Sequence, residues 1–174
     1  EKIMMNRFIT ADGYKIETYQ IHERLEYTIA YDFENSQLPA NGGLRFAQYT
    51  NTAAQEHEAL TLARHMTQKH QIYNTGFSGF KLVANGAVTA ENKKLLLNHI
   101  AKILNGYAGK IYTGCDLNIN DDDMNYLYTM TPYVLNGIGI KQRMLDNAQY
   151  LYPGVQSVNE TININNYQRE SSVY

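Results

Sequence analysis

The chain has 174 residues, enough for one ordinary domain or two very small ones. Hydrophobic residues make up 44% and charged residues 18%, which excludes a largely disordered chain. The net charge of −2 argues against a nucleic-acid partner, and no apolar run reaches the roughly 18 residues of a membrane span. Cys115 is the only cysteine, so no internal disulfide can form, and we expect a reducing, cytoplasmic setting.

The first quarter of the chain is predicted to be extended. Residues 14–21 alternate at period two, which is typical of a half-buried strand. Residues 25–31 are rich in β-branched and aromatic side chains and contain no breaker, which also favours a strand. Residues 43–49 are a further candidate strand.

Two amphipathic helices are predicted in the middle of the chain. The first is capped by Asn51 or Thr52 and runs to about Ile72; the second is capped by Thr89 and stops at Gly106. Apolar residues recur at helical spacing in both, namely Ala59, Leu62, Ala63 and Met66 in the first and Leu96, Ile100, Ile103 and Leu104 in the second.

Shorter elements complete the pattern. Strands are predicted over residues 80–84 and 110–113, and a third helix from Asp121 to about Leu135. Because strands alternate with helices, we expect an α/β fold in which helices cover a sheet.

No metal site is predicted. The segment that begins at Asp116 starts like a calcium loop, but its sixth position is Asp121 rather than Gly and its twelfth is Leu127 rather than Glu. The five histidines show no ligand spacing. The acidic run at 121–123 is interpreted as the ordinary first turn of a helix, stabilised by the helix dipole.

Three segments carry the candidate chemistry, and each lies at a predicted strand end or strand–helix junction, where α/β proteins place their sites. They are residues 39–46, residues 66–81 and residues 116–124. In order, they contain Gly42-Gly43-x-Arg45, Met66-Thr67-x-Lys69, Lys81 closing a glycine-containing turn, and Asp116 opening a segment that ends in Asp122-Asp123-Met124. Lys69 and Lys81 are twelve positions apart.

This order and spacing resemble the substrate-binding and dimerisation domain of the glutamate/leucine/phenylalanine/valine dehydrogenases, from about Leu25 to Gly139. The resemblance implies a single three-layer α/β domain with a mixed sheet. We expect this domain to cover residues 1–151 and an Asn-rich tail to cover residues 152–174. Because the sheet edge of this family pairs across a twofold axis, the resemblance also implies a homodimer.

The resemblance also assigns roles to single residues. Lys69 would bind the α-carboxylate of the substrate as a point charge. Lys81 would be the catalytic lysine, with a pKa lowered by burial and a neighbouring cation, and would activate the water that attacks the imino carbon. Asp116 would move protons to and from the amino nitrogen, while Gly42 and Gly43 would line the substrate side chain.

Two departures from the family pattern change the expected substrate. Asn41 stands where the glutamate-specific members carry a lysine, and an amide pairs poorly with a buried carboxylate. A neutral amino acid or its 2-oxo acid is therefore the expected ligand. Phe77 and Phe80 interrupt the small residues before Lys81, and we expect their rings to crowd the substrate and nicotinamide space.

No cofactor site is predicted within this chain. Gly137 and Gly139 lack the third glycine of a dinucleotide fingerprint, because Gln142 occupies its position, so NAD(P) is expected only if a Rossmann domain is supplied elsewhere. Three functions follow as alternatives: the substrate half of an amino-acid dehydrogenase, a standalone module that has lost dehydrogenase activity and binds an amino acid or a 2-oxo acid or acts on it without redox chemistry, or a degenerate dimerisation module.

Overall fold

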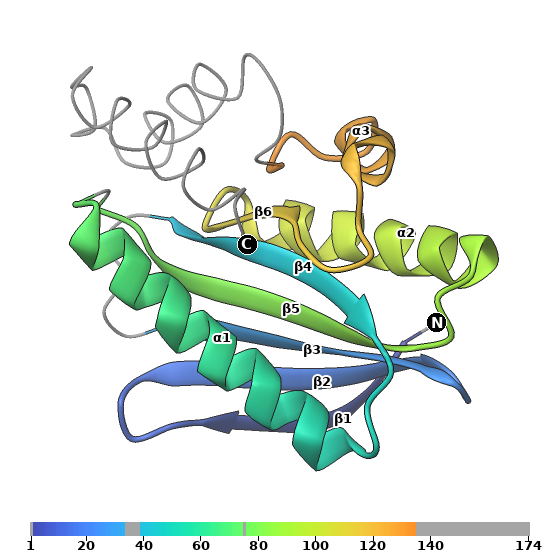
Figure 1. The fold of residues 1–174 in the computed structure, drawn as a ribbon, viewed down its shortest axis with the longest axis horizontal. Coiled ribbons are helices and arrows are strands. Elements are labelled where there is room, and N and C mark those ends of the chain that lie inside the picture. The colour runs from blue at the N-terminus through green and yellow to red at the C-terminus, as the bar shows by residue number, and fades with distance from the viewer. Residues whose placement is uncertain (1, 34–38, 75, 135–174) are drawn as a thin grey trace.

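The computed structural model describes residues 2–33, 39–74 and 76–134. Within these ranges the element order is β1 (Ile3–Ile9), β2 (Tyr14–His22), β3 (Leu25–Asp32), β4 (Ala40–Ala47), α1 (Thr52–Ile72), β5 (Ser78–Gly86), α2 (Ala90–Tyr107), β6 (Ile111–Cys115) and α3 (Asp121–Tyr128) (Figure 1). This arrangement confirms the predicted α/β class. The predicted domain boundary after residue 151 and the tail over residues 152–174 lie outside the described residues.

The six described strands form one mixed sheet in the order β1-β2-β3-β5-β4-β6. The pairs β1–β2, β2–β3 and β3–β5 are antiparallel, whereas β4 runs parallel to both β5 and β6. The parallel half is built by two crossovers, in which α1 connects β4 to β5 and α2 connects β5 to β6. All the predicted site residues fall on this half or on the segments next to it.

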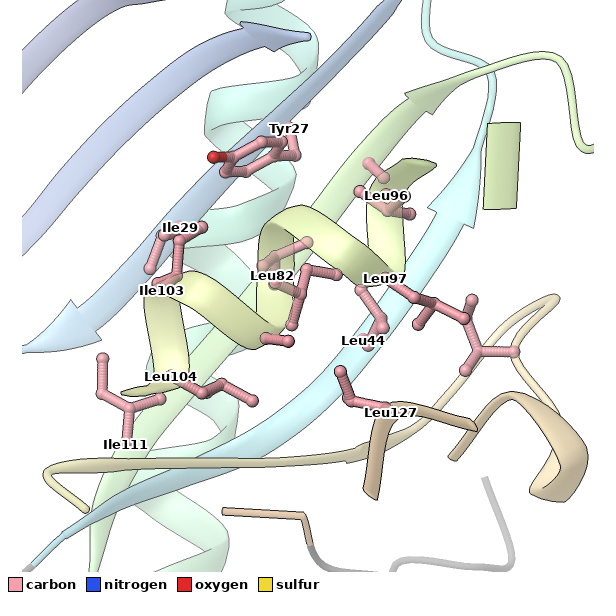
Figure 2. Close-up of a cluster of buried hydrophobic side chains, with 14 of the residues drawn as sticks. Tyr27, Ile29, Leu44, Leu82, Leu96, Leu97, Ile103, Leu104, Ile111 and Leu127 are labelled. Carbon is pink, nitrogen blue, oxygen red and sulfur yellow. The ribbon is translucent and has the colours of Figure 1, made fainter. Parts of the chain in front are cut away.

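Helices cover both faces of the sheet, which gives the three layers that the resemblance implies (Figure 1). On one face, α1 packs through Ala59 and Ala63 against Val83 of β5 and the neighbouring strands. On the other face, α2 and α3 cover the larger core. Figure 2 shows part of that core, in which helix residues such as Leu97 and Leu127 lie over strand residues such as Leu44 and Leu82.

The predicted helix starts are confirmed, but two predicted helix ends are wrong. Asn51 and Thr89 cap α1 and α2 as expected. However, α2 continues through Gly106 to Tyr107 and is capped by Ala108 in the left-handed conformation at φ 52°. The third helix was expected to reach Leu135, which lies outside the described residues; α3 in fact ends at Tyr128. Pro132 follows closely, and a proline disfavours helical backbone at the residue before it.

The predicted strands are present, with shifted bounds. The strand expected over residues 43–49 is β4, which begins at Ala40 and ends at Ala47, because the Gly-Gly pair is held inside the sheet by neighbours on both sides. The strand β1 was not predicted individually. All seven of its residues are exposed, so it has no one-sided apolar pattern that could have identified it.

A buried carboxylate joins β2 to its surroundings and makes stability depend on pH. Glu17 accepts hydrogen bonds from Arg7, Tyr19 and Tyr107 at 2.7–3.1 Å, and Lys15 lies 3.5 Å away. Burial alone would raise the pKa of Glu17, but the hydrogen bonds from Tyr19 and Arg7 and the charge of Lys15 outweigh it and lower the pKa to about 2. The folded state therefore holds Glu17 ionised more strongly than the unfolded chain does.

Because the folded pKa of Glu17 is depressed, its contribution to stability is complete above the unfolded value of 4.5 and is lost as the pH falls toward 2. Between pH 7 and pH 3, the free energy of unfolding of the parent protein should fall by up to about 3 kcal/mol more than that of Glu17→Gln. Urea unfolding of both proteins at pH 7, 5 and 3 measures it. A variant that loses as much stability on acidification as the parent protein would contradict this assignment.

Candidate functional site

The candidate site lies on the sheet face that α1 covers. Successive side chains of a strand point to opposite faces. Leu44 of β4 and Leu82 of β5 belong to the core under α2, so Gly43 and Lys81, one residue earlier in each strand, face the α1 side. The register places Gly43 directly beside Lys81 in the parallel pair. The next strand, β6, ends one residue before Asp116.

A buried ion pair forms the centre of this site. Lys81 is 6% exposed, and its Nζ contacts Oδ2 of Asp116. Gly43 lies against both groups, since a methyl group there would be 3.0 Å from Lys81 Nζ and 3.1 Å from Asp116 Cβ. The structure thus brings together three residues that are widely separated along the chain. Glycine at position 43 therefore lets Lys81 and Asp116 approach the strand more closely than a residue with a side chain would allow.

Lys69 brings a second cation to the same region. It lies in the last turn of α1, half-buried. Burial and the nearby positive charge of Lys81 lower the pKa of Lys69, while the Asp116 carboxylate partly offsets them. Thr67, two residues before Lys69 in α1, accepts a hydrogen bond from the N–H of Gly79, two residues before Lys81 in β5, at 3.0 Å. This contact holds the end of α1 that carries Lys69 against the strand that carries Lys81. Two ammonium groups and one carboxylate therefore share one region.

The pKa values of both members of the central pair, Lys81 and Asp116, are lowered. Burial lowers the pKa of Lys81, and the adjacent Asp116 carboxylate only partly compensates. Burial would raise the pKa of Asp116, but Lys81 and Arg45 outweigh it and lower that pKa. Asp116 therefore stays ionised at neutral pH, and Lys81 releases its proton more readily than an ordinary lysine.

Arg45 and Glu58 extend the Lys81–Asp116 pair into an alternating row of charges. Neither residue was assigned a role from the sequence. Arg45 Nε lies 3.0 Å from Oδ2 of Asp116, and its other side reaches Oε1 of Glu58 at 3.3 Å. Both Lys81 and Arg45 therefore hold the same oxygen of Asp116. The alternation of β4 could have placed Arg45 on the face of Gly43, but nothing in the sequence brings Glu58 of α1 there.

The turn that carries Asp116 is fixed to the end of β4. Asn118 adopts a left-handed conformation at φ 64° and donates a hydrogen bond from Nδ2 to the carbonyl of Phe46 at 2.8 Å. The N–H of Phe46 in turn donates to the carbonyl of Leu117 at 3.0 Å. These bonds hold the segment after β6 beside β4, and so hold the carboxylate against Lys81.

Asn41 and Gly42 lie at the other end of β4 from Arg45. Asn41 is 1% exposed, and its carbonyl accepts a hydrogen bond from Nε2 of His70 at 3.2 Å. Gly42 packs against the neighbouring strand so closely that a methyl group would be 1.5 Å from the carbonyl oxygen of Phe80 and 3.4 Å from Met66 Cγ. Close backbone packing is therefore sufficient to explain glycine at position 42.

The expectation that Phe80 crowds the substrate space is wrong. Phe80 is 1% exposed and belongs to the core under α2, on the opposite face from Lys81, its neighbour in the strand. Phe77 does lie on the side of α1, where its ring packs edge-to-face on His70 with centroids 5.7 Å apart. The departure from small residues at position 80 therefore does not obstruct the ion pair.

Comparison with known proteins decides the family. The Glu/Leu/Phe/Val dehydrogenase dimerisation domain matches residues 17–133. The chain belongs to this family. L-tryptophan dehydrogenase of Nostoc punctiforme is 33% identical over 106 residues, and phenylalanine dehydrogenase of Thermoactinomyces intermedius is 32% identical over 85 residues. The solved structure of the Nostoc enzyme covers 64% of this chain with a TM-score of 0.59 and 29% identity.

These matches cover the dimerisation domain and not whole relatives. They account for 60% and 49% of this chain, but for only 29% and 23% of the tryptophan and phenylalanine dehydrogenases. This chain corresponds to 33% of the solved Nostoc structure. The family is therefore known, whereas the activity of the intact relatives comes to this chain only as a proposal.

The described residues do not fit the nicotinamide cofactor that the family implies. None of the strand–helix turns within residues 2–33, 39–74 and 76–134 carries the three-glycine pattern that holds dinucleotide phosphates. In the same ranges no group of three His, Cys, Asp or Glu side chains could hold a metal ion, and no helix is long and apolar enough to cross a membrane. The chemistry below therefore uses only the side chains of this domain.

Proposed function

We propose that this domain binds a neutral L-amino acid or its 2-oxo acid and forms the substrate side of an amino-acid dehydrogenase site. The observation that supports it is the buried Lys81–Asp116 pair against Gly43, with Lys69 in electrostatic range. A region with two cations and one carboxylate complements a substrate that carries a carboxylate and an α-ammonium group. The name of the family, an amino-acid dehydrogenase, agrees with this chemistry.

Each charged group has a separate task in this proposal. Lys69 binds the α-carboxylate as a point charge. Asp116 holds the α-ammonium group through Oδ1, because Oδ2 is already bound by Lys81 and Arg45. Lys81, with its lowered pKa, acts as the general base. In intact dehydrogenases the nicotinamide cofactor accepts the hydride from the α-carbon. None of the described residues is assigned that role.

The step that these side chains can perform is hydrolysis of the protonated imine, the iminium ion, to the 2-oxo acid and ammonium. The oxygen of a water bonds to the imino carbon while Lys81 takes a proton from that water. This proton is passed across Asp116 to the nitrogen. The carbon–nitrogen bond then breaks, the hydroxyl proton returns to Lys81, and ammonium leaves with that proton, so atoms and charge balance.

Calorimetry with a panel of neutral L-amino acids and their 2-oxo acids tests the proposal, together with NAD(P)-dependent oxidation of the same amino acids. We expect Lys69→Met to weaken binding by about 10- to 100-fold, because a charge-assisted hydrogen bond to the carboxylate is lost. Lys94→Met, which removes an exposed lysine of α2, is the matched control and should bind as the parent protein does. Binding without oxidation would favour a standalone binding module over a dehydrogenase.

The absence of binding by every amino acid and 2-oxo acid in the panel would overturn the proposal. Equal losses in Lys69→Met and Lys94→Met would also overturn it, because a general change in charge, and not a specific carboxylate site, would then explain the result.

We also propose that β1 forms the homodimer contact. It lies at the edge of the sheet with all seven residues exposed, including Ile3, Met4, Met5, Phe8 and Ile9. An exposed apolar edge strand is a template for pairing with another strand. A second copy across a twofold axis would cover it, in keeping with the dimerisation domain to which the chain belongs.

Met5 allows a test that spares the sheet. The register between β1 and β2 shifts between Met4 and Asn6, so Met5 has no partner in β2. We expect Met5→Pro to weaken the dimer at least about tenfold, because a backbone donor and the flat edge are lost at two symmetric positions. Met5→Ala is the control. Sedimentation at micromolar concentration measures the dimer affinity of each protein. A strictly monomeric parent protein would exclude the proposed contact.

A further inference from the structure

Asn41 carries a buried polar group that the fold itself does not satisfy. Asn41 belongs to β4, next to the edge strand β6, and is 1% exposed, and its Nδ2 has no hydrogen-bond partner among the described residues. Buried amide donors in native proteins almost always have a partner, and an exception calls for an explanation. An apolar side chain of the same shape, such as leucine, would avoid the cost.

The position of Asn41 connects this amide to the charged site. Asn41 and Gly43 are two residues apart in β4 and therefore face the same side of the sheet, about 7 Å apart at the strand rise. Asn41 pairs with Gly79 of β5 in the register, and Gly43 pairs with Lys81. The backbone of Asn41 is thus one side-chain repeat along β4 from Gly43, the residue that contacts the ion pair.

The surroundings of Asn41 include the end of helix α1. Its covering helix α1 contributes His70, whose Nε2 donates to the Asn41 carbonyl. Burial lowers the pKa of His70 to about 4, so this ring is neutral at pH 7. Within the described part of the chain, no hydrogen bond involves the Asn41 amide nitrogen. Because the proposed function assigns Lys69 to the α-carboxylate, a second carboxylate brought to the amide would have no counter-ion of its own, which is unfavourable for a buried charge.

We propose that the Asn41 amide selects substrates whose side chain ends in a neutral hydrogen-bond acceptor, a carboxamide or a hydroxyl, over aliphatic side chains of the same shape. This inference rests on the proposed function and names the substrate class of that site. An aliphatic side chain leaves the buried donor unpaired, whereas a carboxamide or hydroxyl pairs with it. Sites built around a hydrogen bond reject analogues that lack the partner more strongly than apolar pockets reject a missing methylene.

Isosteric pairs of amino acids test this selection without any change to the protein. The pairs are asparagine and leucine, glutamine and methionine, and threonine and valine, each titrated by calorimetry into the full chain. We expect the polar member of at least one pair to bind at least about tenfold more tightly than its apolar isostere. Glutamine should also bind more tightly than glutamate.

The variant Asn41→Leu then supplies the reciprocal test. We expect the preference within the favoured pair to reverse, because the orphan donor is gone and the apolar isostere pairs with the new side chain. Binding of the apolar members as tightly as the polar ones in the parent protein would overturn the inference while leaving the proposed function intact. No binding by any amino acid would instead overturn the proposed function. If Asn41→Leu fails to fold, the comparison of isosteres in the parent protein still decides.

Discussion

Replacing Lys81 with methionine is expected to reduce amino-acid turnover in the intact protein by about 10²- to 10⁴-fold, the usual contribution of a positioned general base. Methionine keeps the length of the buried side chain and removes its charge. Lys81 is 6% exposed and touches Asp116, so the substitution removes a buried charge directly beside that carboxylate. Because burial lowers the pKa of Lys81, its base form is lost as the pH falls, and the parent rate should fall with it.

The control and the pH profile separate catalysis from folding. Asp116 keeps Arg45 as a partner at 3.0 Å in Lys81→Met, so the variant should retain the fold, which circular dichroism and urea unfolding measure. The pH-dependent limb assigned to Lys81 should disappear. Lys94→Met, an exposed substitution of the same type, should leave both rate and profile unchanged. Turnover within a factor of two of the parent in Lys81→Met would remove Lys81 from the mechanism.

Local patterns predicted the secondary structure well wherever one side of an element is buried. The helical spacing of Leu96, Ile100, Ile103 and Leu104 is confirmed, since all four lie in the core under α2. The exposed strand β1 has no buried side and gave no such pattern. The predicted end of α2 was wrong for a different reason. Glycine commonly follows the end of a helix, but Gly106 is part of α2, and Ala108 adopts the left-handed cap conformation instead.

The ion pair could not have been derived from local patterns, because Lys81 and Asp116 lie on different strands and meet only through sheet order. The family motif supplied the pairing as an expectation. The same motif misled at Phe80, although alternation alone was enough to correct it: adjacent residues of a strand face opposite sides. Glu58 illustrates the remaining limit, since its contact with Arg45 depends on how α1 lies across the sheet.

The position of α1 matters for the site because this helix carries Lys69 and Glu58. Gly79 of β5 sets its distance from the sheet. A methyl group at Gly79 would lie 2.1 Å from the carbonyl oxygen of Ala63 and 2.5 Å from the backbone nitrogen of Thr67. The N–H of Gly79 also donates to the Thr67 hydroxyl at 3.0 Å. Helix and strand are therefore in direct backbone contact, only two residues before Lys69 in the helix.

We expect Gly79→Ala to destabilise the fold by about 3 kcal/mol or more, since backbone atoms of α1 cannot move aside as a flexible side chain can. Urea unfolding measures this effect. Gly106→Ala is the matched control: none of the described residues lies within 4 Å of its added methyl group, and alanine in the last turn of α2 should stabilise by at most about 0.5–1 kcal/mol. Any Gly79→Ala protein that folds should bind 2-oxo acids more weakly, because α1 must carry Lys69 away from Lys81. Parent-like stability and binding in Gly79→Ala would contradict both the close helix–strand contact and the placement of Lys69 that depends on it.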